Sequence, residues 1–255
     1  MPTVGSLFSG IGALDLGLER AGFEIAFQIE IDSYCQQVLA KHWPDVKRYG
    51  DIKTVGAASL FPVDLICAGF PCQPFSVAGQ KKGVEDDRFL WPEIIRIVRV
   101  LRPAFLLLEN VPGLLIRGLG RVLGELAASG YHAEWRCISA AEVGAPHRRK
   151  RLFIVAYPSS FGFVQAVVFN NDLKEDLEKM AAQAQEYWSG KLNLCPSGRV
   201  RLVPVDRVLG VGDGRSQSMD AVKAIGNAVV PQVIEVIGRQ IIKLIEKGVT
   251  NERTS

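Results

Sequence analysis

Cys72 lies in an uncharged loop, GFPCQPFS, directly after the apolar run VDLICAGF. Two prolines restrict the backbone around it, and loops at strand ends are where α/β enzymes present reactive side chains. Cys67 lies inside the apolar run, as a buried packing residue would. The position of Cys72 therefore predicts a nucleophilic thiolate, although a loop cysteine considered alone is more often structural.

A carboxylate occupies a similar place after a second apolar run. Glu109 belongs to ENVPG, which ends the run AFLLLEN. A carboxyl group near a reacting thiolate can hold or exchange a proton with the substrate. Taken alone, Glu109 could equally be an acid that caps a following helix.

The end of a third apolar run carries glycines instead of reactive side chains. LFSGIG places Gly10 and Gly12 in a tight turn between a strand and a helix, where a ligand can approach the backbone. Eighteen residues beyond Gly12, Glu30 ends the next strand, where an acid can accept bonds from both ribose hydroxyls. Asp15 stands where the dinucleotide fingerprint has its third glycine, which favours a nucleoside without a pyrophosphate.

The elements that must position these residues alternate between strands and helices over the first 157 residues. Short apolar runs predict strands at 3–8, 23–29, 63–70, 104–110 and 152–157, and amphipathic patterns predict helices between them, including 33–43 and 92–101. This order predicts a doubly wound, mostly parallel sheet whose ligands bind beyond the carboxyl ends of the strands. The three segments GFPCQPFS, ENVPG and LFSGIG all fall at such ends.

The pattern changes after residue 157. A helix is predicted over 170–188, with asparagines placed to cap it. Its apolar residues recur at helical spacing, at Leu173, Leu177, Met180, Ala184 and Tyr187. Its polar face is acidic, so we expect this helix to pack on protein and not on phosphates. A long amphipathic helix is predicted near the end, in VVPQVIEVIGRQIIKLIEK.

Composition excludes some classes of protein. A net charge of +3 gives no global basic field, so a nucleic acid would have to bind a local patch. Five cysteines without paired spacing and only three histidines make a zinc site improbable, so no metal is expected. No apolar run reaches the roughly 18 residues that span a membrane, and a signal peptide is not expected. Free thiols fit a reducing cytoplasm, the expected location.

The order of these motifs resembles that of the cytosine-5 DNA methyltransferases. GFPCQPFS resembles the family's nucleophile loop, and ENVPG resembles the segment whose acid engages the base. RFLWPEIIRIV, GAPHRRKRLFIVA and AIGNAVVPQV are similar to further family segments in the same order. The resemblance covers residues 3–157 and about 213–240, and it implies a Rossmann-like methyltransferase fold with a small inserted second domain.

The resemblance also implies roles for individual residues. Cys72 would be the nucleophile, Glu109 would engage the flipped-out cytosine, and Arg149 and Arg151 would contact base or phosphate in double-stranded DNA. The implied cofactor is S-adenosyl-L-methionine. Its pocket would be formed by Phe8, Ser9, Gly10, Gly12, Glu30, Ile31, Asp51, Ile52, Gly69, Leu90, Asn227 and Val229.

The region that would recognise the target is short. We predict a catalytic domain from residues 1–157 and 219–247, a small, reduced target-recognition domain at 158–218, and a tail at 248–255. Residues 158–218 carry seven basic and seven acidic side chains, a poor balance for holding phosphates. We therefore expect the protein either to read a short target site of about two to four base pairs or to bind DNA weakly, since each base contact contributes only about 1–3 kcal/mol.

Two departures from the family leave other functions open. His147 stands where the family has a glutamine, and no clear R-x-x-x-G segment precedes the last motif. One alternative is a tRNA cytosine-5 methyltransferase, although the CFT sequence expected of that branch is absent. The other is an inactive, methyltransferase-like DNA-binding protein. The sequence does not indicate a partner subunit or a cognate restriction enzyme.

Overall fold

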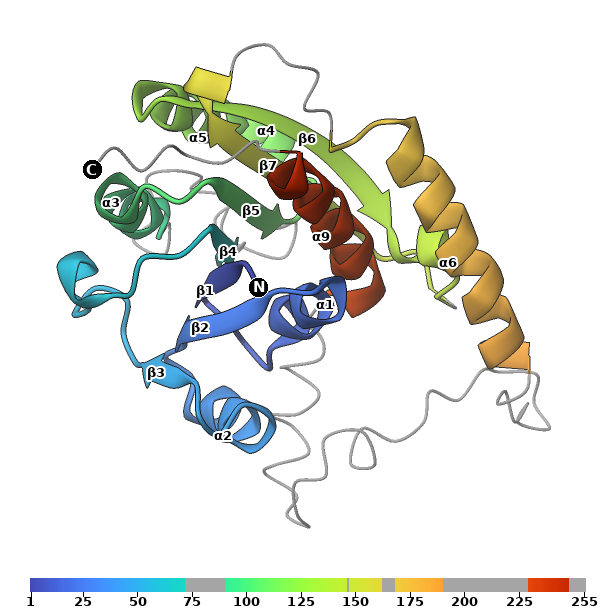
Figure 1. The fold of residues 1–255 in the computed structure, drawn as a ribbon, viewed down its shortest axis with the longest axis horizontal. Helices are drawn as coiled ribbons and strands as arrows, with labels where there is room; N and C mark the ends of the chain where they lie inside the picture. Colours follow the sequence, from blue (N-terminus) through green and yellow to red (C-terminus); the bar gives the residue numbers. More distant parts are fainter. Residues whose placement is uncertain (72–89, 146, 162–167, 190–228, 248–255) are drawn as a thin grey trace.

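The computed structural model describes residues 1–71, 90–145, 147–161, 168–189 and 229–247 (Figure 1). Within these residues, seven strands form one sheet in the order β3-β2-β1-β4-β5-β7-β6. The strands are β1 (Thr3–Leu7), β2 (Glu24–Ile29), β3 (Lys47–Tyr49), β4 (Leu65–Gly69), β5 (Phe105–Asn110), β6 (Tyr131–Ser139) and β7 (Lys150–Pro158).

Strands β1 to β5 run parallel to one another, and β7 alone runs in the opposite direction. β7 runs antiparallel to β5 on one side and to β6 on the other. The predicted mostly parallel sheet is therefore confirmed, and the predicted strand at 152–157 lies in it as the antiparallel member. This reversal matters for the site, because the beginning of β7 lies beside the carboxyl ends of the parallel strands.

Helices cover both faces of the sheet (Figure 1). The described helices are α1 (Ala13–Ala21), α2 (Ser33–His42), α3 (Trp91–Leu101), α4 (Leu114–Arg117), α5 (Leu119–Ala128), α6 (Asn171–Ser189) and α9 (Pro231–Glu246), with short 3-10 turns η1 (Ala57–Ser59), η3 (Ala140–Val143) and η4 (Ser159–Phe161). α3 and α5 pack on one face, and α1, α6 and α9 pack on the other.

The sheet is buried on both sides, which explains the uninterrupted apolar runs. In β5, Leu106 and Leu108 face the cluster that includes Trp91 of α3, whereas Phe105 and Leu107 face the cluster that includes Ile234 of α9. A strand that alternates between two apolar environments shows no polar period in its sequence. This is why the central strands were predictable as short continuous apolar runs.

The predicted helix near residue 170 is confirmed as α6. The side chain of Asn170 accepts a hydrogen bond from the backbone N–H of Leu173 at 3.0 Å, and Leu177 is buried one turn later. The carboxylate of Asp176 accepts from Gln240 of α9 at 2.7 Å. The expectation that this helix packs on protein is thus confirmed. The side chain of the predicted Tyr187 lies outside the described part.

Two strands were not predicted. β3 is only three residues long, and β6 is partly exposed on most of its length, with Trp135 about half exposed. Edge strands of this kind lack the apolar period from which strands are recognised. The predicted domain boundaries stay a prediction, because residues 190–228 are outside the described range.

The contact between α1 and α9 depends on a glycine and generates a stability prediction. A Cβ at Gly17 would lie 2.5 Å from both the Cβ of Ile234 and the carbonyl oxygen of Pro231. Gly17→Ala should therefore lower the free energy of unfolding by about 1–3 kcal/mol, because overpacking outweighs the better helix propensity of alanine. Urea unfolding measures this difference.

Gly124→Ala in α5 is the matched control. A Cβ at this helical position would meet nothing within 4 Å. Alanine should here stabilise the protein by about 0.5–1 kcal/mol. Equal stability of the two variants would contradict the close approach of α1 and α9.

Candidate active site

The turn between β1 and α1 is built from left-handed backbone conformations. Phe8, Gly10 and Gly12 have φ values of 55°, 56° and 81°. A Cβ on Gly12 would clash with the ring of Trp43, whereas one on Gly10 would meet nothing within 4 Å. Gly12 is thus required for packing, and the backbone at Gly10 faces open space that a ligand could fill.

Glu30 joins this turn to the next strand. One carboxylate oxygen accepts a hydrogen bond from the backbone N–H of Gly10 at 2.7 Å, and the other accepts from the N–H of Asp32 at 2.8 Å. Each oxygen retains a further lone pair, so the carboxylate can still accept bonds from a ligand. Ile31, which follows Glu30 beyond the carboxyl end of β2, is 69% exposed.

A buried polar network links the helix that follows this turn to strands β1 and β2. The carboxyl group of Asp15 accepts from the hydroxyl of Ser6 on β1 at 2.5 Å and from the side-chain amide of Gln28 on β2 at 2.6 Å. Burial raises the pKa of Asp15 to about 6, although both hydrogen bonds lower it. The residue at the third glycine position therefore ties α1 to two strands.

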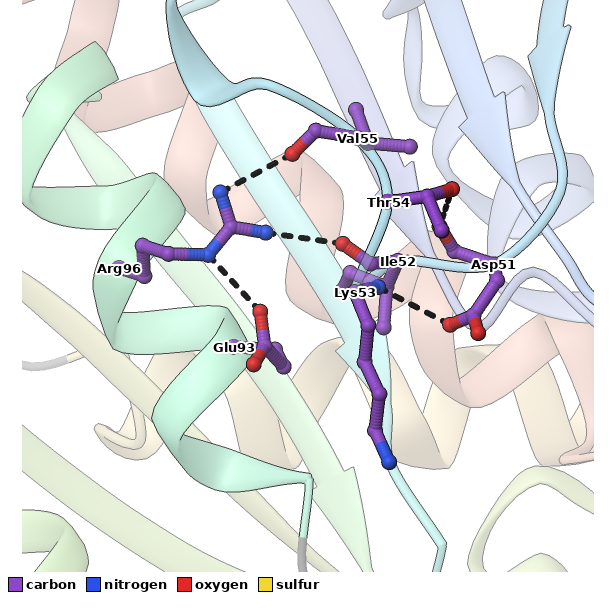
Figure 2. A network of polar contacts seen from close by, with 7 residues as sticks. All are labelled: Asp51, Ile52, Lys53, Thr54, Val55, Glu93 and Arg96. Carbon is purple, nitrogen blue, oxygen red and sulfur yellow. Dashed lines mark hydrogen bonds and ion pairs between the residues drawn. The ribbon is translucent and has the colours of Figure 1, made fainter.

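The turn after β3 is held from α3 (Figure 2). The guanidinium of Arg96 donates to the carbonyl oxygens of Ile52 at 2.8 Å and Val55 at 3.0 Å. Glu93, one helical turn earlier, accepts from the Nε of Arg96 at 2.8 Å. The side chain of Ile52 is buried, so only its backbone is available to a ligand at this turn.

The ends of β4 and β5 form a second group of residues. Gly69 pairs with Glu109 across these parallel strands, and a Cβ on Gly69 would lie 3.3 Å from a carboxylate oxygen of Glu109. The side-chain amide of Asn110 donates to the carbonyl oxygen of Phe70 at 3.3 Å. The chain leading to Cys72 is thus fastened to β5 two residues before the cysteine. Cys72 itself lies outside the described residues.

Glu109 is buried in an ion pair with the first residues of β7. Its carboxylate lies 2.9 Å from the Nε of Arg151, and only 8% of the residue is exposed. Burial raises the pKa of Glu109 to about 7, and this outweighs the opposing effects of Arg151 and Arg149. Near neutral pH the group therefore exists in both protonation states.

The sequence of the chain matches the model of a known protein family. The family model described as C-5 cytosine-specific DNA methylase matches residues 3–194. The chain belongs to the C-5 cytosine-specific DNA methylases. This confirms the family resemblance seen in the order of the motifs.

Named relatives of this chain are type II methyltransferases. M.NgoBI of Neisseria gonorrhoeae is 37% identical over 162 residues, which are 62% of this chain and 51% of the relative. M.DsaV of Dactylococcopsis salina is 33% identical over 210 residues, covering 76% of this chain and 60% of the relative. The chain thus spans only about half the length of these relatives.

Solved structures share the fold of this chain at low sequence identity. A protein described as a DNA modification methyltransferase from a prophage of E. coli has a TM-score of 0.68 at 21% identity, covering 96% of this chain and 100% of its own. A variant of Spodoptera frugiperda DNMT2 has a TM-score of 0.68 at 16% identity, covering 95% and 100%. The predicted Rossmann-like fold is therefore confirmed.

The structure gathers most of the predicted site residues into two neighbouring groups. The first group lies at the ends of β1, β2 and β3. It consists of Phe8, Ser9, Gly10, Gly12, Glu30 and Ile31, followed by Asp51 and Ile52 after β3. Gly69, Glu109, Arg149 and Arg151 lie at the ends of β4 and β5 and the start of β7. Their roles in binding and catalysis stay predictions.

Three other predicted residues have different places. Leu90 is the N-cap residue of α3, and its carbonyl accepts from the N–H of Glu93 at 3.2 Å. Val229 lines a pocket with Arg149 and Arg151, between the start of β7 and α9. Asn227 lies outside the described residues, as Cys72 does.

Two further features are absent from the part of the chain that the structure describes. In this part of the chain no group of three or more His, Cys, Asp or Glu residues could hold a metal ion. Among the helices described, none is long and apolar enough to cross a membrane.

Asn110 and Arg96 were missed by the sequence analysis. Asn110 belongs to ENVPG and was available as a motif residue, but its bond to Phe70 crosses between strands. Arg96 lies on the polar side of an amphipathic helix, where an arginine is usually a solvated residue. The spacing of Glu93 and Arg96 indicates an ion pair within the helix, but it does not indicate the two backbone carbonyls.

The raised pKa of Glu109 generates a pH prediction. Its pKa is about 7 in the folded protein against an ordinary value of 4.5, so between these values only the folded state retains the proton. The free energy of unfolding should therefore fall as the pH rises from about 4.5 to about 7. Glu109→Gln, which keeps the shape and cannot titrate, should show a smaller fall.

Urea unfolding of both proteins across this range measures the effect. Asp15 also has a raised pKa and contributes in the same direction, but it is present in both proteins. The difference between the two pH profiles consequently isolates Glu109. Identical profiles would show that the carboxyl group titrates at its ordinary pKa.

Proposed function

We propose that the protein transfers a methyl group from S-adenosylmethionine to carbon 5 of cytosine in DNA, through a covalent adduct with Cys72. The observation that carries the proposal is the buried Glu109, paired with Arg151 beside the chain that leads into the Cys72 loop. The type II methyltransferase names of the relatives support DNA as the substrate and restriction–modification as the setting.

The residues at the ends of β1 and β2 fit a nucleoside cofactor. The open space at Gly10 admits a ligand against the backbone, and the free lone pairs of Glu30 suit two neighbouring ribose hydroxyls. The exposed Ile31 offers an apolar surface for a flat base. When bound, S-adenosylmethionine would supply an electrophilic methyl group.

Cys72 and Glu109 would activate the cytosine together. Carbon 5 is a poor nucleophile until the Cys72 thiolate adds to carbon 6 and makes the ring enamine-like. Glu109, protonated part of the time near pH 7, can donate to ring N3 and accept from the exocyclic amine, which stabilises the adduct. Once carbon 5 carries the methyl group and S-adenosylhomocysteine has been left behind, a base takes the proton from carbon 5. The electrons of that bond re-form the double bond between carbons 5 and 6, and the Cys72 thiolate is expelled.

The substrate base must leave the duplex to reach these groups. Carbon 6 of a stacked cytosine cannot be approached by a side chain in line, so the base flips into the pocket. Arg148 and Lys150 are exposed around the start of β7, next to the carboxyl ends of the parallel strands. This local basic cluster is suited to phosphates, although the net charge of the whole chain is small. We expect the protein to act in the cytoplasm, where its thiol stays reduced.

DNA carrying 5-fluorocytosine tests the nucleophile. Fluorine cannot leave as a cation, so after methyl transfer the adduct should persist and remain covalent through denaturing electrophoresis. Wild type should form this adduct with duplex DNA in the presence of S-adenosylmethionine, and Cys72→Ala should form none.

Cys67→Ala is the control for this experiment. Cys67 is fully buried in β4, and burial raises the pKa of its thiol, so it should contribute no nucleophile. An adduct that survives in Cys72→Ala would show that another residue attacks the base. A methyl acceptor found only among tRNA molecules would instead favour the RNA alternative.

A further inference from the structure

The order of the strands determines which way a bound nucleoside points. Glu30 ends β2, and Glu109 ends β5 on the far side of β1 and β4. With the ribose at Glu30, the transferred methyl group has to face β4 and β5, so the nucleobase faces β3. The N–H of Glu30 donates to the carbonyl of Tyr49 at 3.0 Å, so the turn after β3 begins beside that base.

The bonds inside this turn fix its shape but not its position. The carboxylate of Asp51 accepts from the N–H of Lys53 at 2.9 Å. Thr54 donates to the carbonyl of Asp51 from its N–H at 3.0 Å and from its hydroxyl at 2.8 Å (Figure 2). All of these partners belong to the turn itself.

β3 gives the turn little additional support. It has three residues and pairs with β2 on one side only, at the edge of the sheet. The buried side chains of Ile52 and Val55 resist withdrawal of the turn from the core, but apolar contacts do not fix its rotation. A directional contact from outside is needed to aim the Asp51 carboxylate.

Arg96 supplies that contact. One planar guanidinium donates to two carbonyls three residues apart, at Ile52 and Val55, which fixes both the position and the rotation of the turn. Glu93 in turn accepts from the Nε of the same side chain, which fixes the orientation of the guanidinium whose two terminal nitrogens donate to the turn. Figure 2 shows this chain of contacts from α3 to the segment that contains Asp51.

We propose that Arg96 is a positioning residue for nucleobase recognition, which aims the Asp51 carboxylate at the 6-amino group of adenine. This inference rests on the proposed function, because it takes S-adenosylmethionine as the ligand. A carboxylate accepts a hydrogen bond from an amine and repels an oxo group in the same place. Arg96 therefore determines selectivity for adenine over hypoxanthine without touching the ligand.

The experiment compares two ligands by titration calorimetry. S-adenosylhomocysteine carries the 6-amino group, and S-inosylhomocysteine carries an oxo group in its place. Wild type should prefer the adenine compound by about tenfold, the effect of roughly one hydrogen bond to a charged acceptor. Arg96→Met should weaken binding of the adenine compound by about tenfold and bring the two affinities close together.

Three further variants separate positioning from general stability. Arg99→Met is the matched control, since Arg99 lies on the same helix and donates to Ser129 instead. It should keep the wild-type preference. Glu30→Gln should weaken both ligands alike, because the ribose is common to them. Arg96→Lys, which retains a charge but not the two-pronged donor, should give an intermediate preference and keeps the test informative if Arg96→Met does not fold.

The outcomes distinguish this inference from the proposed function. If wild type binds neither ligand, the proposed function is wrong and the inference falls with it. If wild type prefers the adenine compound and Arg96→Met and Arg96→Lys keep that preference, the inference alone is wrong. Loss of preference in the Arg99→Met control would also overturn it, because the effect would then be a general property of α3.

Discussion

The ion pair between Glu109 and Arg151 depends on a single antiparallel strand. If β7 ran parallel to β5, its first residues would lie beside the amino-terminal end of β5, away from Glu109 at the carboxyl end. Because β7 is reversed, Arg151 lies 2.9 Å from the carboxylate and Arg149 adds a second positive charge. A carboxylate with so little exposure would otherwise be strongly disfavoured, since burial without a charged partner is costly. The opposition between burial and the two arginines leaves its pKa near neutrality.

The other end of the site is organised by polar side chains in a similar way. Asp15 ties α1 to β1 and β2, and Glu30 ties the β1 turn to the start of α2. Arg96 extends the same principle to the turn after β3. In each case a side chain with several hydrogen-bonding atoms joins backbone segments that the sheet ladder alone does not connect. These side chains thus hold in place the loops that face the proposed cofactor.

The sequence predicted the parts of the fold that depend on local patterns. The apolar runs at β4 and β5, the glycine turn with Glu30, and the capped amphipathic helix α6 follow from residue type and spacing within short windows. The antiparallel direction of β7, the short edge strand β3 and the bond from Asn110 to Phe70 do not, because they depend on which distant segments become neighbours. For Arg96 the local pattern indicated a solvent-exposed helical residue, and only the three-dimensional arrangement shows its two carbonyl partners.

Together these features are consistent with the proposed methyl transfer at the carboxyl ends of the parallel strands, with the nucleoside proposed to lie at β2 and β3 and the cytosine at β4, β5 and β7. We propose that the protein methylates cytosine in DNA through Cys72. Sequencing of DNA from cells that express the protein, after chemical conversion of unmodified cytosines, tests this proposal. We expect protected cytosines at one short recurring sequence with wild type and none with Cys72→Ala. Protection that persists in Cys72→Ala, or DNA left unprotected while tRNA becomes methylated, would contradict it.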